Sequence, residues 1–220
     1  PNWSEVARFR DVEARDAAAL RAQLELPEDQ KIILYSGNIG EKQGLESVID
    51  AAAQLGSHVT IGSLRATDLP LDTPQYMNEL ATALFPCVEY ARRNGVALIL
   101  EALNRYEVCQ LHSAQEMMDY MAFSDAPENV GVLWDLFHAG IEDADFSTAI
   151  ATLGARLRHV HLADSNRGFP GYGHLPLDEV YTALRLAGYQ GAVSLECLCR
   201  PSAQTVIDEA GELIARLRRL

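Results

Sequence analysis

The sequence has few basic residues for its number of acidic ones. Its 220 residues include 18 Lys and Arg against 31 Asp and Glu, which gives a formal net charge of −13 at pH 7. Binding to a nucleic-acid backbone needs clustered Lys and Arg, and anionic membranes attract basic segments. The charge therefore argues against a nucleic-acid partner and gives no support for a membrane partner.

Long apolar runs are also missing, and cysteines are few. We find no run of the roughly 18–20 apolar residues that a transmembrane helix needs, and we expect no signal peptide. Four cysteines are too few for a disulfide scaffold in a chain of this length. The hydrophobic share of 48% is ordinary for a globular protein. We therefore expect a reduced, cytoplasmic protein of one or two domains.

Short apolar runs alternate with segments of helical periodicity. Six runs predict buried strands: KIILYSG, HVTIG, VALILEA, VGVLWD, LRHVHLAD and GAVSLEC. Helices are predicted near residues 14–24, 45–55, 75–94, 113–123, 146–153, 177–187 and 203–217. This alternation predicts an α/β fold with a parallel sheet. Periodicity alone leaves a barrel and an open, doubly wound sheet as alternatives.

Four polar residues stand at the ends of successive apolar runs: Glu101, Asp135, His161 and Glu196. The carboxyl ends of parallel strands meet at one edge of a sheet. Carboxylates and imidazoles are ligands for divalent cations, whereas three carboxylates buried together without a cation would be costly. A single strand-end carboxylate is usually structural, but four such residues in succession predict a divalent-metal site.

Three further polar residues lie just beyond strand ends. His138 follows Asp135 by three residues, and we expect it in the loop after the strand. There it would contact either a substrate oxygen or solvent. Glu107 and Arg167 also lie past strand ends, with the same two alternatives.

The remaining histidines have weaker contexts. His159 shares a strand face with a candidate ligand and is predicted to be a structural residue inside a barrel. His58 and His112 have no supporting neighbours and are expected at the surface. His174 lies in a glycine-rich loop, residues 166–174, which we expect to lie over the pocket.

Five motifs carry a family resemblance over residues 58–220. VTIGSLR, EALNRYE, WDLFHAGIE, HVHLADSNRGFPGYGH and VSLECL occur in this order. Together they resemble the xylose isomerase-like TIM-barrel family of sugar isomerases and epimerases. Within it, the chain looks most similar to the ketose 3-epimerases and the keto-sugar-acid epimerases.

The resemblance implies roles for seven residues. It implies that a metal, Mn²⁺ or else Mg²⁺ or Co²⁺, is held by Glu101, Asp135, His161 and Glu196. It also implies that the substrate, a small sugar or keto-sugar, is contacted by Glu107, His138 and Arg167. None of these seven residues departs from the family motifs.

The implied chemistry is proton transfer beside a carbonyl group. The metal would bind the carbonyl and a neighbouring hydroxyl of an open-chain ketose and acidify the carbon-bound proton. Glu101 and Glu196, on opposite faces of the substrate, would remove that proton and return one from the other side. The cation would stabilise the enediolate between the two steps. This arrangement favours an epimerase, and the residues leave an isomerase of the same family open.

The start of the chain carries a different resemblance. Residues 1–57, through LYSGNIGEKQGLE above all, resemble the opening of the C-terminal Rossmann-like domain of GT-B glycosyltransferases of the group 1, WcaI-like type. The later E-x7-E element of that domain is absent. No nucleotide-sugar site can therefore be transferred to this chain.

The two resemblances meet near residues 55–58. If Glu196 follows strand eight of the family barrel, HVTIG is strand four, so strands one to three are missing. We therefore expect a chimera that forms one compact domain: an incomplete or hybrid (β/α) barrel of about six parallel strands. Residues 1–57 would complete the sheet begun by residues 58–220. An unpaired parallel edge invites association, and hence a homodimer.

Three functions follow as alternatives. The first is a divalent-metal-dependent sugar epimerase or isomerase. The second is a metal-binding scaffold without turnover, because the missing strands would remove a wall of the pocket and shifts of about 1 Å impair catalysis. The third, a glycosyltransferase fragment, is disfavoured by the missing donor motif. A DNA-repair role like that of endonuclease IV shares the barrel but is disfavoured by the acidic charge and the lack of additional metal-binding histidines.

Overall fold

The structure is a computed structural model that describes residues 45–63 and 72–217. The strand expected at 31–37, the helix expected at 14–24 and the rest of the glycosyltransferase-like segment before residue 45 lie outside the described residues. All described residues belong to one structural unit, which spans residues 36–220.

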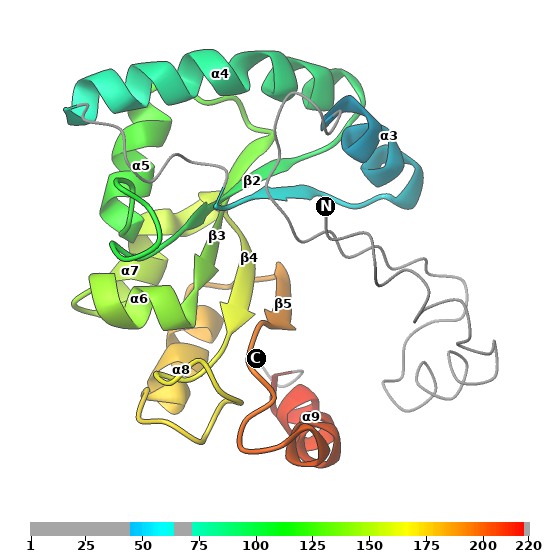
Figure 1. The fold of residues 1–220 in the computed structure, drawn as a ribbon, viewed down its shortest axis with the longest axis vertical. Helices are drawn as coiled ribbons and strands as arrows, with labels where there is room; N and C mark the ends of the chain where they lie inside the picture. The colour runs from blue at the N-terminus through cyan, green and yellow to red at the C-terminus, as the bar shows by residue number, and fades with distance from the viewer. Residues whose placement is uncertain (1–44, 64–71, 218–220) are drawn as a thin grey trace. The chain divides into compact units, whose positions relative to one another are not determined.

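The described part of the chain contains one sheet of five parallel strands in consecutive order. The strands are β1 (Val59–Ile61), β2 (Leu98–Ala102), β3 (Val130–Asp135), β4 (Leu157–Leu162) and β5 (Ala192–Leu195). A doubly wound sheet reverses its strand order at a switch point, whereas in a (β/α) barrel each strand pairs with the next strand in the sequence. The sheet curls as a partial barrel (Figure 1), so the predicted incomplete α/β barrel is confirmed.

Helices connect the strands and cover the outer face of the sheet (Figure 1). They are α3 (Leu45–Leu55), α4 (Thr73–Arg93), α5 (Ala114–Phe123), α6 (Leu136–Glu142), α7 (Phe146–Leu153), α8 (Leu177–Leu186) and α9 (Ala203–Leu217). Capping boxes begin α4 at Asp72 and α5 at Ser113, where each side chain accepts a hydrogen bond from a backbone N–H of the first turn. None of the described helices is both long and apolar enough to cross a membrane.

Alternate strand residues lie on opposite faces of the sheet. The outer face packs under the helices and contributes buried residues to the main core, among them Ile61, Leu100, Val132, Trp134 and Leu162. The inner face carries the alternating residues, which include the buried apolar Ile99 and Leu133 and the acidic Glu101 and Asp135. The fold therefore places polar chemistry on the inner face.

Strand register aligns the polar residues at one edge of the sheet. Asp135 pairs with His161 across β3 and β4, and His161 pairs with Ser194, two residues before Glu196. From β4 to β5 the candidate ligand therefore lies two residues further along its strand than the register partner of His161. Such an offset between neighbouring strands is the stagger that a barrel requires. This register brings the carboxyl ends of the strands around one point.

Three sequence-based expectations were wrong in detail, those for His138, His58 and His112, and the side chain of His112 is only 18% exposed. His138 does not lie in a loop but in α6, because the Asp135 carboxylate caps this helix by accepting hydrogen bonds from the backbone N–H groups of Phe137 and His138. His58 is not a surface residue but is half-buried, and its Nε2 lies 3.0 Å from Nδ1 of His159. His159 itself lies on the inner face of β4, as predicted for a structural barrel residue.

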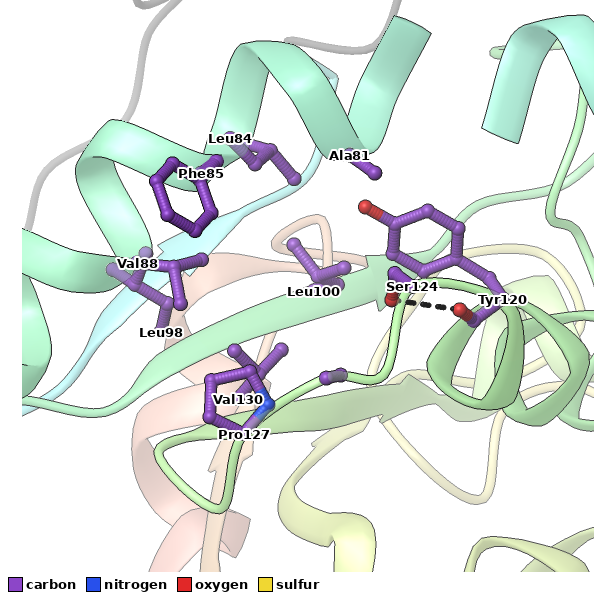
Figure 2. A pocket seen from close by; sticks show the side chains of 11 residues that line it. Ala81, Leu84, Phe85, Val88, Leu98, Leu100, Tyr120, Ser124, Pro127 and Val130 are labelled. Atoms are coloured by element: carbon purple, nitrogen blue, oxygen red, sulfur yellow. Dashed lines mark hydrogen bonds between the residues drawn. The ribbon is translucent and has the colours of Figure 1, made fainter. Parts of the chain in front are cut away.

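A cavity of about 110 Å³ lies between α4, α5 and the outer face of β2. Figure 2 shows that apolar side chains line it, with Leu84, Phe85 and Val88 of α4 facing Leu98 and Leu100 of β2. This cavity belongs to the helix-covered face, which is the opposite face from the polar cluster described below.

Candidate metal centre

The structure brings the four expected metal ligands together. Nδ1 of His161 lies 3.2 Å from Oε2 of Glu196, 3.5 Å from Oε1 of Glu101 and 3.6 Å from Oδ2 of Asp135. Candidate ligand atoms from all four residues lie within 4.8 Å of one another. Each residue stands at or just beyond the carboxyl end of a different strand, from β2 to β5.

Asp135 gives the clearest indication that the cluster fits a cation. Its side chain is fully buried, and its Oδ1 caps α6. The other oxygen, Oδ2, is buried and has no hydrogen-bond partner among the described residues. Burial raises the pKa of this carboxyl group, against the opposing effect of His161. A buried carboxylate oxygen that lacks a donor and faces the cluster is the group that a metal ion would satisfy.

The imidazole of His161 carries the compensating charge when only protein groups are present. Burial disfavours the charged ring, but the surrounding carboxylates of Asp135, Glu101 and Glu196 favour it and raise the pKa of His161 to about 11. The same contact with His161 lowers the pKa of Glu196 to about 2. Three carboxylates and one imidazole are oxygen and nitrogen ligands suited to a divalent ion, which would replace the proton on His161.

A glycine makes room for one of the ligands. Gly62 follows β1, and a Cβ atom built on it would lie 2.5 Å from Oε2 of Glu101. Such a distance is too short for a carbon–oxygen contact, so any larger residue would displace the carboxylate. The packing of Glu101 into the cluster therefore requires glycine at position 62.

The three expected substrate contacts lie beside the cluster. Nη1 of Arg167 donates to Oε1 of Glu107 at 2.8 Å, and its Nη2 lies 3.9 Å from Oε2 of Glu196. The Arg167 guanidinium also covers the ring of Phe137, 5.0 Å from the ring centroid. Nδ1 of His138 lies 3.9 Å from Oε1 of Glu107. The structure therefore places these three residues next to one another and beside the four-residue cluster.

The sequence patterns did not single out two buried polar residues, Asn104 and Asp164, that hold this neighbourhood in place. The Asp164 carboxylate accepts hydrogen bonds from the backbone N–H groups of Ser165, Gly171 and Leu175 at 2.7, 2.8 and 3.1 Å. It thereby organises the loop that carries Arg167 to the cluster. Both residues sit inside the quoted motifs, EALNRYE and HVHLADSNR, which was the available signal.

A staggered parallel sheet with three carboxylates and an imidazole at its carboxyl ends defines a partial (β/α) barrel with a candidate divalent-metal centre. Residues 40–220 match the model of the Xylose isomerase-like TIM barrel family. The chain belongs to this family.

Several proteins similar to this chain are sugar epimerases. The chain is 34% identical over 161 residues to the D-psicose 3-epimerase of Agrobacterium fabrum, a match that covers 70% of this chain and 55% of the relative. A crystal structure of D-psicose 3-epimerase with D-tagatose from Clostridium cellulolyticum H10 aligns with a TM-score of 0.64 at 31% identity, and covers 71% of this chain and 55% of that one. The chain thus spans about half the length of these relatives.

A short, separate match concerns a different class of protein. Over 55 residues, or 25% of this chain, the sequence is 69% identical to a putative colanic acid biosynthesis glycosyl transferase, WcaI, of Escherichia coli. That stretch makes up only 14% of the transferase. This match agrees with the glycosyltransferase resemblance of the first part of the chain.

Proposed function

We propose that the chain is a divalent-metal-dependent sugar epimerase or isomerase. The observation that carries the proposal is the convergence of Glu101, Asp135, His161 and Glu196 within 4.8 Å at the carboxyl ends of four strands. The family membership and the named activities of the relatives support the same reaction class. Mn²⁺ is the ion that the family resemblance implies, with Mg²⁺ or Co²⁺ as alternatives, and a ligand set rich in carboxylates suits Mn²⁺ and Mg²⁺.

A bound divalent ion would supply electrophilic stabilisation of an enediolate at this site. The protein residues would then move the proton. Glu196 lies at the more open side of the cluster, with a side chain 48% exposed, where it would serve as a base. Glu101 approaches from the buried side, with a side chain 10% exposed. A carbon between these two carboxylates would lose its proton to one and receive a proton from the other.

Local charge favours an uncharged ketose over a sugar acid. Four carboxylates gather here, from Glu101, Asp135, Glu196 and Glu107, and Arg167 is paired with Glu107. A divalent ion and Arg167 together carry three positive charges, one fewer than the four carboxylates. An additional carboxylate on the substrate would therefore meet net repulsion. The relatives named after ketoses agree with this preference.

A metal-binding scaffold without turnover is the second candidate. The chain spans about half the length of the epimerases that it matches, and β1 pairs with β2 alone among the described strands. We propose that residues 1–57 derive from a glycosyltransferase-like sequence, so that the chain is a chimera in which this segment replaces three barrel strands. The 55-residue match to the WcaI transferase supports this origin. The replaced strands would have formed one wall of the sugar pocket.

Solvent-deuterium exchange separates the two candidates. The full chain, loaded with Mn²⁺, would be incubated with free ketoses in D₂O and the sugars examined by NMR. Epimerisation through an enediolate should place deuterium on the carbon beside the carbonyl, and Glu101→Gln or Glu196→Gln should abolish it. Glu128→Gln, an exposed carboxylate before β3, is the matched control and should behave like the unmodified chain. A chain that binds Mn²⁺ but exchanges no deuterium would be the scaffold.

A further inference from the structure

We propose that Asn104 is a positioning residue that keeps the ring proton of His138 on Nε2, so that His138 presents a hydrogen-bond donor to the active site. Asn104 lies two residues beyond β2 and is 2% exposed. His138 lies in the first turn of α6 and is completely buried. Neither residue belongs to the four-ligand cluster.

The contacts of Asn104 fix which way its amide group points. Its Oδ1 accepts a hydrogen bond from the backbone N–H of Tyr106 at 2.9 Å, so this atom must be the oxygen. The opposite atom, Nδ2, lies 3.5 Å from a carboxylate oxygen of Glu107, which can only accept. Both neighbours therefore require the NH₂ group to face away from Tyr106 and towards His138.

The amide orientation in turn fixes the ring of His138. Nδ2 of Asn104 lies 2.7 Å from Nδ1 of His138, and the backbone N–H of Asn104 points at the same nitrogen from 3.4 Å. Two N–H groups thus converge on Nδ1, which must be an acceptor without a proton of its own. A neutral imidazole with an unprotonated Nδ1 carries its proton on Nε2.

The N–H group at Nε2 of His138 is held in a fixed position and has no acceptor among the described residues. Nε2 of His138 is buried and has no hydrogen-bond partner among the described residues. The ring cannot turn easily, because it is completely buried, its Nδ1 is held by Asn104 and it packs edge to face against Phe137. A buried N–H without an acceptor costs free energy, so its retention points to a ligand that supplies the acceptor.

The nature of that acceptor rests on the proposed function. His138 is anchored to Asp135, one of the four cluster residues, and its Nδ1 lies 3.9 Å from Glu107. A sugar held at the cluster would place hydroxyl or carbonyl oxygens nearby, and Nε2–H would donate to one of them. Asn104 would then act on the reaction through His138, without contact with the sugar.

Imidazole nitrogen NMR tests the tautomer directly. The full chain would be labelled with ¹⁵N-histidine and studied without metal or substrate, by long-range ¹H–¹⁵N correlation. The six histidines make the spectrum tractable, and His138→Gln identifies the signals of this ring. We expect a non-protonated Nδ1 and a protonated Nε2. In Asn104→Asp the carboxylate should draw a proton onto Nδ1, which moves that signal to the protonated position.

A matched asparagine controls for loss of structure. Nδ2 of Asn129 donates to the backbone carbonyls of Val88 and Val96, away from the cluster. Asn129→Leu removes a comparable amide and should leave the His138 signals unchanged, whereas Asn104→Leu should give a mixture of the two tautomers. A proton on Nδ1 of His138 in the unmodified chain would overturn the proposal, even if no variant folds.

Turnover gives a second readout that separates this inference from the proposed function. If the chain epimerises a ketose, Asn104→Asp should lower kcat/KM by about 10- to 100-fold, the usual effect of losing a partner that orients an active-site group. Unchanged kcat/KM in a folded Asn104→Asp variant with a displaced proton would overturn the positioning role. Absence of turnover in the unmodified chain would contradict the proposed function and leave the tautomer measurable.

Discussion

Nδ1 of His161 lies 3.2 Å from Oε2 of Glu196, although 35 residues separate the two in sequence. The same nitrogen faces Glu101 and Asp135 at 3.5 and 3.6 Å. One imidazole nitrogen is thus shared by three carboxylates from three other strand ends. A proton or a metal ion can hold this arrangement together, and the two must compete for it.

Competition between proton and metal predicts a pH dependence of metal binding. The pKa of His161 is raised from 6.5 to about 11, so near pH 7 the ring is protonated in the metal-free protein. A metal ligand must be neutral imidazole, so binding of Mn²⁺ should release about one proton from this ring. Titration calorimetry in two buffers of different ionisation enthalpy measures the release. Identical apparent enthalpies in both buffers would contradict the prediction.

The same shift predicts how the metal-free protein responds to pH. A raised pKa in the folded state means that the stabilising contribution of His161 is complete below pH 6.5 and is lost as pH rises towards 11. Urea unfolding of the EDTA-treated chain at a series of pH values should therefore show falling stability across this window. His161→Gln removes the titrating ring and should flatten that part of the curve. An equally steep fall in the variant would assign the effect to other groups.

Gly62→Ala should weaken metal binding without unfolding the protein. The new methyl group would lie 2.5 Å from Oε2 of Glu101 and displace a ligand. We expect Mn²⁺ affinity to fall by about tenfold or more, in line with changes to groups that orient metal ligands. Calorimetric titration gives the affinity.

A second glycine provides the control for this change. A Cβ on Gly211 in α9 meets no atom within 4 Å, so Gly211→Ala should keep full affinity. It should also add helix propensity of up to about 1 kcal/mol. Equal affinities for the two variants would show that Glu101 is not needed in its observed position.

Asp164→Asn should loosen the loop that carries Arg167. An amide offers one acceptor oxygen where the carboxylate of Asp164 accepts from three backbone N–H groups on its two oxygens. Leaving a buried N–H group unsatisfied costs about 1–3 kcal/mol of folding free energy. Urea unfolding measures the loss, and faster amide exchange at Gly171 and Leu175 would locate it.

The cap of α7 supplies the comparison for Asp164. Asp145 accepts from the backbone N–H of Thr148 at an exposed helix start. Asparagine is about as good a helix cap as aspartate, so Asp145→Asn should change stability by only a few tenths of a kcal/mol, roughly. Comparable losses in both variants would mean that Asp164 has no special role in the loop.

Much of the site was predictable because strand ends are visible in sequence. Apolar runs that end in Glu101, Asp135, His161 and Glu196 locate four carboxyl ends, and parallel pairing brings such ends together. Their order was also predictable in outline, since consecutive strands of a barrel are neighbours. The strand expected at 31–37 lies outside the described residues and stays a prediction.

Other features depend on contacts that no local pattern encodes. The short helix α6 begins at once after β3 because Asp135, a candidate ligand, is also the N-cap of this helix. His138 therefore lies in a buried helix and not in the loop that the sequence predicted. His58 is half-buried because His159, 101 residues later, supplies a partner. Asn104 and Asp164 matter through hydrogen bonds to backbone and ring atoms, which become visible only in three dimensions.

The central claim is that the four strand-end residues form one metal site, and thermal melting tests it most directly. The chain would be melted with EDTA and with excess Mn²⁺, alongside Glu196→Gln and the exposed control Glu128→Gln. Binding to the folded state alone stabilises it by about 2.7 kcal/mol at a hundredfold excess over Kd. We expect Mn²⁺ to raise the Tm of the unmodified chain and of the control but not of Glu196→Gln. No shift in the unmodified chain, or an equal shift in Glu196→Gln, would contradict the assignment of this site.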